Sequence, residues 1–490
     1  MDSRGIFEQH GRQAYLAALL LSVAVGMGGC AKFSPDGGML AVQAAAGAEL
    51  GKDIVKLRDE RDAAMVAARV KALKARPLTA WSAVQIALIN NRSLQAAFNE
   101  LGISEAQMVE ASLPPAPTLS LQRTVGSGFE IERMIVQNVL ALLTLPRQRE
   151  IAEARFAQAQ ARAAEMTLRI AMDAARTYYR AVAANETVKL LEESRKSAEA
   201  VSDLAKQLGE TGAMSKLEQA REHVFYAELS AQLATARLRQ RSERERLTRV
   251  LGLWGGDVSF KLPDRLPALP GRARTVASVE RDAVGRRVDL VIARMEIDIL
   301  ALQLGLTRRT RFINLLEVAG VSTNEKDKKV DNGIVDIERI KRGGFEVEFR
   351  IPIYDFGEAR VRLAEETYMH AVNRLLARAV NVRSEAREAY QAYRGAYDIA
   401  RQYEREVLPL RKIISDETML NYNAMMKDLF VLLAEARARI TASIQAVEAR
   451  REFWVASVDL HAAIIGGRGG ETAEMPTTTA AAAGAQPGGH

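Results

Sequence analysis

The residue types that carry out most protein chemistry are present in this chain, but they are not arranged for catalysis. Its histidines have no spacing typical of a metal site; they are His10, His223, His370, His461 and His490. No nucleophile elbow, phosphate-binding loop or dinucleotide fingerprint occurs where a strand would meet a helix. The many carboxylates lie in charged helical segments, where a solvated face explains them better than a catalytic pair. We therefore expect no enzyme, no cofactor and no resident metal.

One cysteine has surroundings that suggest covalent modification. Cys30 is the only cysteine and follows Met27-Gly28-Gly29, after an apolar run at 14–25 that is preceded by Arg4 and Arg12. That run suits a signal-peptide core and is too short to span a bilayer. The arrangement resembles a bacterial lipobox, in which the thiol is acylated. We predict a lipoprotein signal peptide at 1–29 and a lipid anchor on Cys30; an incidental cysteine is the alternative.

A strand with one charged and one apolar side is predicted near residue 350. Glu346, Glu348, Arg350 and Pro352 alternate with apolar residues that run from Phe345 to Ile353. About nine residues with one apolar face is the pattern of a tilted transmembrane β-strand. The half-buried strand of a soluble sheet would have the same pattern. In an oligomeric channel, Glu346, Glu348 and Arg350 would form charged rings that tune permeation.

Two short interruptions of long helical segments are further candidates. One contains Gly212 and Ser215, and the other contains Lys427 and Asp428. Methionines gather around both of them, at Met214, Met419, Met425 and Met426. Thioethers are soft ligands for Cu(I), but methionine more often serves as an adaptable packing residue. We therefore expect turns between helices here, with the methionines as packing residues and Cu(I) ligation as the alternative.

These candidates lie on an internal duplication. The first repeat, 78–270, is predicted to hold two strands at about 117–144 and a helical hairpin at about 146–251. The second, 271–466, is predicted to hold strands at about 312–353, with a polar loop at 322–343, and a helical hairpin at about 356–465. In each repeat a proline is expected where strand gives way to helix: Pro146 in the first, and Pro352 followed by Gly357 in the second.

The flanking segments and the composition complete the outline. Residues 30–77 are expected to form a lipidated arm, extended to about residue 51, and then a charged helix. Residues 467–490 have the low complexity of a disordered tail. The net charge is +7, but acidic and basic residues are interleaved, which is not the clustered pattern of a nucleic-acid binder. We expect no nucleic-acid partner.

The strand pattern has a consequence for assembly. Four strands with lipid-facing side chains cannot close on themselves, and an open sheet edge is not tolerated in hydrocarbon. Several chains would have to share one barrel, and three of them would supply twelve strands, within the known range. The sequence itself does not determine that number.

At this point the chain resembles the TolC outer-membrane efflux family. The resemblance rests on Thr79 to Leu88 with Asn90-Asn91, on Arg350 to Gly357, and on Leu420 to Met425 with Leu429, Leu432-Leu433 and Ala434. It spans about residues 78–465. It implies a trimeric twelve-stranded β-barrel in the outer membrane, a long α-helical periplasmic tunnel, and docking to a periplasmic adaptor and an inner-membrane pump. It also implies that tip aspartates such as Asp428 form a constriction. The second interruption resembles that of family members associated with heavy-metal efflux, so the resemblance suggests heavy metals or drugs as substrates.

The first repeat departs from the family pattern, since Pro146 is followed by Arg147 and not by an aromatic residue, Asp and Gly. Two alternatives to the efflux channel stay open. One is the exit duct of a type I protein secretion system, which has the same fold. The other is a periplasmic lipoprotein scaffold without a pore.

Overall fold

The computed structural model describes residues 33–125, 129–212, 214–275, 277–331, 334–427 and 429–467. The chain folds into two compact units, which we describe separately. The first unit takes the described residues of Met1–Val42, Ala97–Ala163 and Asp289–Ala379. The second takes those of Gln43–Ala96, Ala164–Val288 and Val380–His490. None of the described helices is both long enough and apolar enough to cross a membrane.

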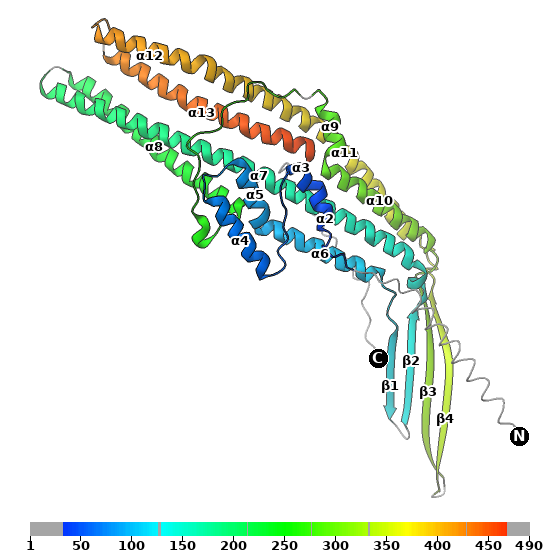
Figure 1. Cartoon of the computed structure of the whole chain (residues 1–490). Coiled ribbons are helices and arrows are strands. Elements are labelled where there is room, and N and C mark those ends of the chain that lie inside the picture. The colour runs from blue at the N-terminus through cyan, green and yellow to red at the C-terminus, as the bar shows by residue number, and fades with distance from the viewer. Residues whose placement is uncertain are drawn as a thin grey trace. The chain divides into compact units, whose positions relative to one another are not determined.

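The first unit contains an antiparallel sheet of four strands. These are β1 (Thr118–Val125), β2 (Phe129–Asn138), β3 (Leu315–Asp331) and β4 (Ile334–Arg350), and they lie side by side in chain order (Figure 1). Strands β2 and β3 come from different repeats, so the duplication is joined within one sheet. Strands β1 and β4 form its two edges.

The second strand pair is much longer than the sequence pattern predicted. A polar loop was expected at 322–343, but β3 and β4 are 17 residues each and pair from Leu315↔Arg350 to Asp331↔Ile334. The loop prediction is therefore wrong. Polar side chains do not prevent a strand whose backbone pairs with a neighbouring strand, and side-chain polarity alone misleads there.

The predicted junction at Pro146 is also wrong. Strand β2 ends at Asn138, and α7 (Val139–Glu210) has already begun, so 139–144 is helix and Pro146 lies inside it. Asn138 starts the helix, because its side-chain oxygen accepts a hydrogen bond from the backbone N–H of Ala141 at 2.8 Å. A proline in the second or third turn removes one bond of the helical ladder, which the helix tolerates here.

Helices of the first unit continue from the strands. They are the parts of α6 (Arg92–Ser112) and α7 that belong to this unit, α10 (Val288–Arg309) and the first part of α11 (Glu358–Gln402). Polar contacts join them: the Gln158 amide donates to the Glu296 carboxylate at 2.6 Å, and Arg378 pairs with Asp289 at 3.1 Å. Strands β2, β3 and β4 are thus connected to α7, α10 and α11, which these polar contacts join to one another.

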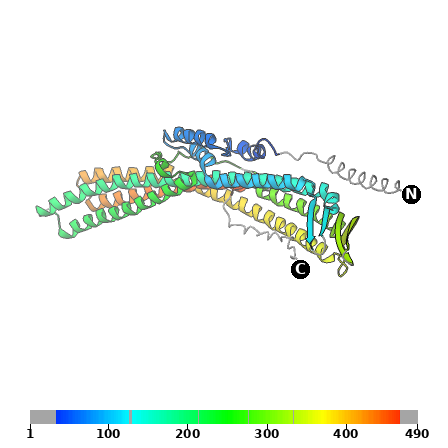
Figure 2. The same ribbon diagram turned by 90° about the horizontal axis from the view of Figure 1, so that it is seen from below.

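The second unit is built mainly from two helical hairpins, which Figures 1 and 2 show lying side by side. One hairpin is the rest of α7 with α8 (Lys216–Leu251). The other consists of the end of α11, the π-helical η3 (Tyr403–Val407), α12 (Leu408–Asn423) and α13 (Leu429–Ile465). A shared apolar cluster packs them together; it contains Val188, Leu191, Phe225, Leu229 and Leu233, with Ile440 and Ile444 from α13.

Shorter elements complete the second unit. They are η1 (Gln43–Gly47), α3 (Ala48–Leu50), α4 (Glu60–Lys74), α5 (Ala80–Asn90), η2 (Gly255–Val258) and α9 (Val279–Arg286). In the first unit, α2 (Met39–Val42) precedes η1 directly in the chain. The expected extended arm is therefore wrong over 39–50, which is helical. The expected charged helix is present as α4, and Asp59 caps it by accepting from the Asp62 N–H at 2.8 Å.

Candidate functional site

Strand β4 carries the three charged residues that the sequence pattern singled out. Glu346, Glu348 and Arg350 alternate along it, and their side chains lie on one face of the sheet because residues two apart share a face. Directly paired residues of neighbouring strands share a face as well. Glu348 is paired with Glu317 of β3, and Glu346 with Ala319. The three residues are thus part of a surface to which other strands contribute.

That surface, here called the charged face, is strongly acidic. The register places on it Glu130, Glu132, Glu317, Glu325, Glu338, Glu346 and Glu348, together with Arg342 and Arg350. Both guanidinium groups have carboxylates nearby, Arg342 with Glu325 at 3.5 Å and Arg350 with Glu348 at 3.9 Å. Sequence reasoning missed the acidic residues of β2 and β3. The alternation in each strand could have found them, but their alignment could not be known.

The opposite side of the sheet, here called the apolar face, carries large hydrophobic side chains. The register aligns Phe349 with Leu316, Val347 with Val318, and Phe345 with Gly320, Ile135 and Leu119. These side chains are strongly exposed, for example Phe345 at 82% and Leu119 at 74%. Large contiguous exposed apolar surface marks a site of contact with protein or membrane.

The junction between β4 and α11 is a tight turn with special backbone geometry. The Pro352 carbonyl accepts a hydrogen bond from the Phe356 N–H at 2.7 Å, and Gly357 has φ +73°. Asp355 then caps the helix, accepting from the N–H groups of Gly357 at 3.0 Å and Ala359 at 3.2 Å. These bonds hold the pKa of the Asp355 carboxyl below its usual value. Pro352 and Gly357 therefore lie where strand gives way to helix, as expected.

The first helical turn, between α7 and α8, contains Gly212 and Ser215. Gly212 has φ +76°, and nothing lies within 4 Å of the position that its Cβ would take. Ser215 caps α8 in a reciprocal pair with Glu218, at 2.9 Å and 3.3 Å. The turn is thus specified locally, by residues within it.

The second helical turn, between α12 and α13, exposes Lys427 and the side chains of Met425 and Met426. Asp428, the predicted constriction residue, lies outside the described residues, and so does the predicted anchor Cys30. Both turns are at the same end of the second unit, since Arg221 of α8 lies over the Phe430 ring of α13 at 5.9 Å (Figure 1).

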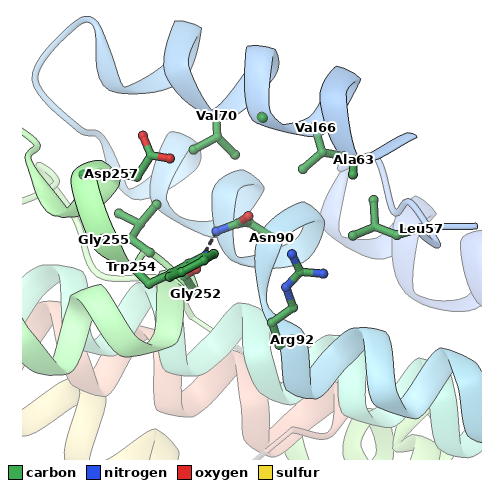
Figure 3. Close-up of a pocket in the computed structure, with 13 residues that line it drawn as sticks. Leu57, Ala63, Val66, Val70, Asn90, Arg92, Gly252, Trp254, Gly255 and Asp257 are labelled. Atoms are coloured by element: carbon green, nitrogen blue, oxygen red, sulfur yellow. Dashed lines mark hydrogen bonds between the residues drawn. The ribbon is translucent and has the colours of Figure 1, made fainter. Parts of the chain in front are cut away.

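A hollow of about 350 Å³ in the second unit is the main candidate for a small-molecule pocket. Figure 3 shows Val66 and Val70 of α4 above Trp254 and Asn90. The amide of Asn90 already donates to the backbone carbonyl of Gly252 at 2.8 Å, and Asp257 is paired with Lys74 at 2.8 Å. These polar groups hold the surrounding turn together and are not left free for a ligand.

The sheet offers the chemistry of a surface and not that of a reaction centre. Among the described residues, no group of three or more His, Cys, Asp or Glu side chains could hold a metal ion. One sheet face is acidic, and the other carries large exposed hydrophobic side chains.

No protein family model and no curated protein matches this sequence. Solved structures match it in fold. CusC, from a study of its folding and transmembrane channel formation, aligns with a TM-score of 0.65 at 15% identity, over 79% of this chain and 92% of that chain. The outer-membrane channel OprN aligns with a TM-score of 0.63 at 17% identity, over 79% and 89%.

A third match is the outer membrane channel CmeC of Campylobacter jejuni, with a TM-score of 0.62 at 17% identity, over 79% of this chain and 85% of that chain. Identities this low compare folds and not activities. The chain has a TolC-like fold, which confirms the resemblance that its motifs indicated.

Proposed function

We propose that this chain is the outer-membrane channel of a tripartite efflux system and conducts substrates passively to the cell exterior. The single observation that carries the proposal is the separation of chemistry between the two sheet faces. An acidic face suits a water-filled lumen, and an apolar face suits lipid. The shared fold with CusC, OprN and CmeC supports the same role. The proposal assigns no catalysis to the chain.

A homotrimer with a twelve-stranded barrel would complete the sheet. Strands β1 and β4 are the edges of a four-stranded sheet in the described part of the chain. Each edge leaves backbone N–H and C=O groups that must pair within a membrane. Three chains, each pairing its β1 with a neighbour's β4, would satisfy every edge. The helices of the three chains would then enclose the periplasmic tunnel.

The partners of this channel would be a periplasmic adaptor and an inner-membrane pump. The helical turns at Gly212–Ser215 and around Lys427 are the surfaces that we propose to meet the adaptor, because they are exposed ends of paired helices. A type I protein secretion duct has the same fold, and the neighbouring genes would separate the two roles. Asp428 remains our proposed constriction residue.

A lipid anchor on Cys30 is proposed as a second attachment to the outer membrane, with the signal peptide at 1–29 removed. Two or more acyl chains hold a protein firmly, whereas one holds it weakly. Cells labelled with a radioactive fatty acid should yield labelled protein, and Cys30→Ser should yield none. Label retained by the Cys30→Ser protein would refute the anchor and leave the channel proposal untouched.

The channel role is tested by inserting purified protein into planar lipid bilayers. A channel gives discrete conductance steps, whereas the alternative of a poreless scaffold gives none. Two variants of adjacent residues sharpen the test. Val347→Arg places a charge on the apolar face, where arginine in a barrel costs roughly 2–4 kcal/mol at mid-membrane, and should prevent insertion. Glu348→Arg changes the charged face and should insert with altered ion selectivity. Equal behaviour of the two variants would contradict the assignment of faces.

A further inference from the structure

The apolar face is not uniformly apolar, and its charges are all of one sign. Towards the hairpin ends of the strands it carries basic side chains, namely Arg123, Arg133, Lys326, Arg339 and Lys341. Among the residues of the sheet whose side chains the structure describes, no Asp or Glu lies on this face. The acidic residues of these strands that the structure describes with their side chains lie on the charged face.

The register brings these bases close together. Arg339 is paired directly with Lys326, and Lys341 lies on the same face two residues along β4. Arg123 lies on β1, where it is paired with Ile131 of β2, and Ile131 is in turn paired with Asn324 of β3. Paired strands are about 4.8 Å apart, so like charges directly opposite each other repel unless an anion lies between them.

The cationic side chains on the two sheet faces have different neighbouring groups. On the charged face, Arg342 and Arg350 each have a carboxylate within 4.0 Å. On the apolar face, Lys326 lies over the ring of Phe129, at 5.7 Å from the ring centre. Within the described residues, the bases of the apolar face have no carboxylate partner. An anionic ligand would therefore meet cations that these residues do not neutralise.

The position of the bases indicates which anion fits. From Phe345 to Lys341 the strand advances roughly 13 Å, so the bases border the zone of Phe345, Val347 and Phe349. A ligand that suits both zones has apolar chains next to anionic groups. Guanidinium and ammonium groups bind phosphate oxygens well, and arginine does so through two parallel hydrogen bonds. A phosphorylated lipid combines these two chemistries.

We propose that this basic border binds the phosphate groups of lipids in the outer leaflet of the outer membrane, while the lipid acyl chains cover the adjoining apolar residues. The inference rests on the proposed function, because the tunnel helices would then face the periplasm and the hairpin ends would reach the outer leaflet. The bound lipid neutralises the facing cations, and so stabilises the long hairpin of β3 and β4.

The test measures lipid binding to the purified, detergent-solubilised protein by native mass spectrometry. The probes are diphosphorylated lipid A and the same lipid without its phosphates. The test variant is Arg339→Gln with Lys341→Gln. The matched control is Arg342→Gln with Arg350→Gln, which removes the same charge from the same strand on the opposite face. We expect the test variant to bind the phosphorylated lipid about tenfold less tightly, since lost charge-assisted hydrogen bonds are worth at least that factor.

Three results would overturn the inference: unchanged binding in the test variant, an equal loss in the control variant, or equal binding of the lipid without phosphates. Planar-bilayer conductance of the same preparations keeps the two proposals apart. Conductance with no phosphate preference refutes the lipid site alone. Absence of conductance from every preparation refutes the channel, whatever the lipid measurements give.

Discussion

Gly357 offers a quantitative test of the junction between β4 and α11. Its φ is +73°, and an added Cβ would lie 2.2 Å from the backbone oxygen of Arg311. An ordinary contact is roughly 3.4 Å, so Gly357→Ala requires the backbone to move by about 1 Å. The left-handed conformation itself costs alanine about 1 kcal/mol.

The displaced carbonyl of Arg311 takes part in the packing of the junction. It accepts a hydrogen bond from Arg360 at 3.2 Å, and the Arg311 side chain donates to the carbonyl of Phe356 at 3.2 Å. Loss of one such bond to a charged group costs about 1.5–3 kcal/mol where it is shielded from water, and less here because these side chains are exposed. We therefore expect Gly357→Ala to destabilise the protein by about 2–4 kcal/mol, the sum of the conformational cost and a partial loss of these contacts.

Gly212→Ala is the matched control. Gly212 has nearly the same φ, +76°, but an added Cβ would have nothing within 4 Å of it. Only the conformational cost of about 1 kcal/mol should remain. Chemical unfolding of both purified variants, followed by circular dichroism, should show the larger loss for Gly357→Ala. Equal losses would refute the argument that the contact with Arg311, and not the backbone angle, makes glycine necessary at the junction.

Three further predictions concern charge. Replacing both Glu317 and Glu348 with Gln should make the channel measurably less cation-selective, as seen in the reversal potential under a salt gradient; unchanged selectivity would show that the charged face does not line the conduit. Burial raises the pKa of Glu222 above its usual 4.5 despite the nearby Arg437, so the folded state holds this proton more tightly and stability falls as pH rises from 4.5 through the raised pKa. Glu222→Gln should flatten that fall in melting temperature, and a slope as steep as in the parent protein would contradict it. Burial lowers the pKa of Lys52 to about 8, so stability should rise between pH 8 and 10.5, and Lys52→Met should remove the rise; a melting temperature that does not change with pH in the parent protein would disprove this.

Local sequence was sufficient for the helices and for the ends of several of them. The long segments with few Gly or Pro residues predicted both helical hairpins, because helix formation depends on neighbouring residues. The first turn was recognised from Gly212 and Ser215, and its cap joins Ser215 to Glu218, only three residues away. The alternation from Phe345 to Ile353 predicted strand β4 near its C-terminal end, because its period is a property of one segment.

Tertiary structure decided what depends on pairing between distant segments. Residues 322–343 are polar and have the composition of a loop, yet the backbones of β3 and β4 pair along their whole length. Pro146 does not lie at the strand–helix junction, because α7 already begins after the cap at Asn138.

The two faces of the sheet likewise arise only from the register of β2 against β3, whose residues are about 190 positions apart in the chain. A shift of one residue would place the acidic side chains of one strand among the apolar residues of the next. The sequence alone determined that each strand alternates. The fold decided that, in the described part of the sheet, acidic residues gather on one face and bases on the other, because face identity is shared across strands through backbone hydrogen bonds.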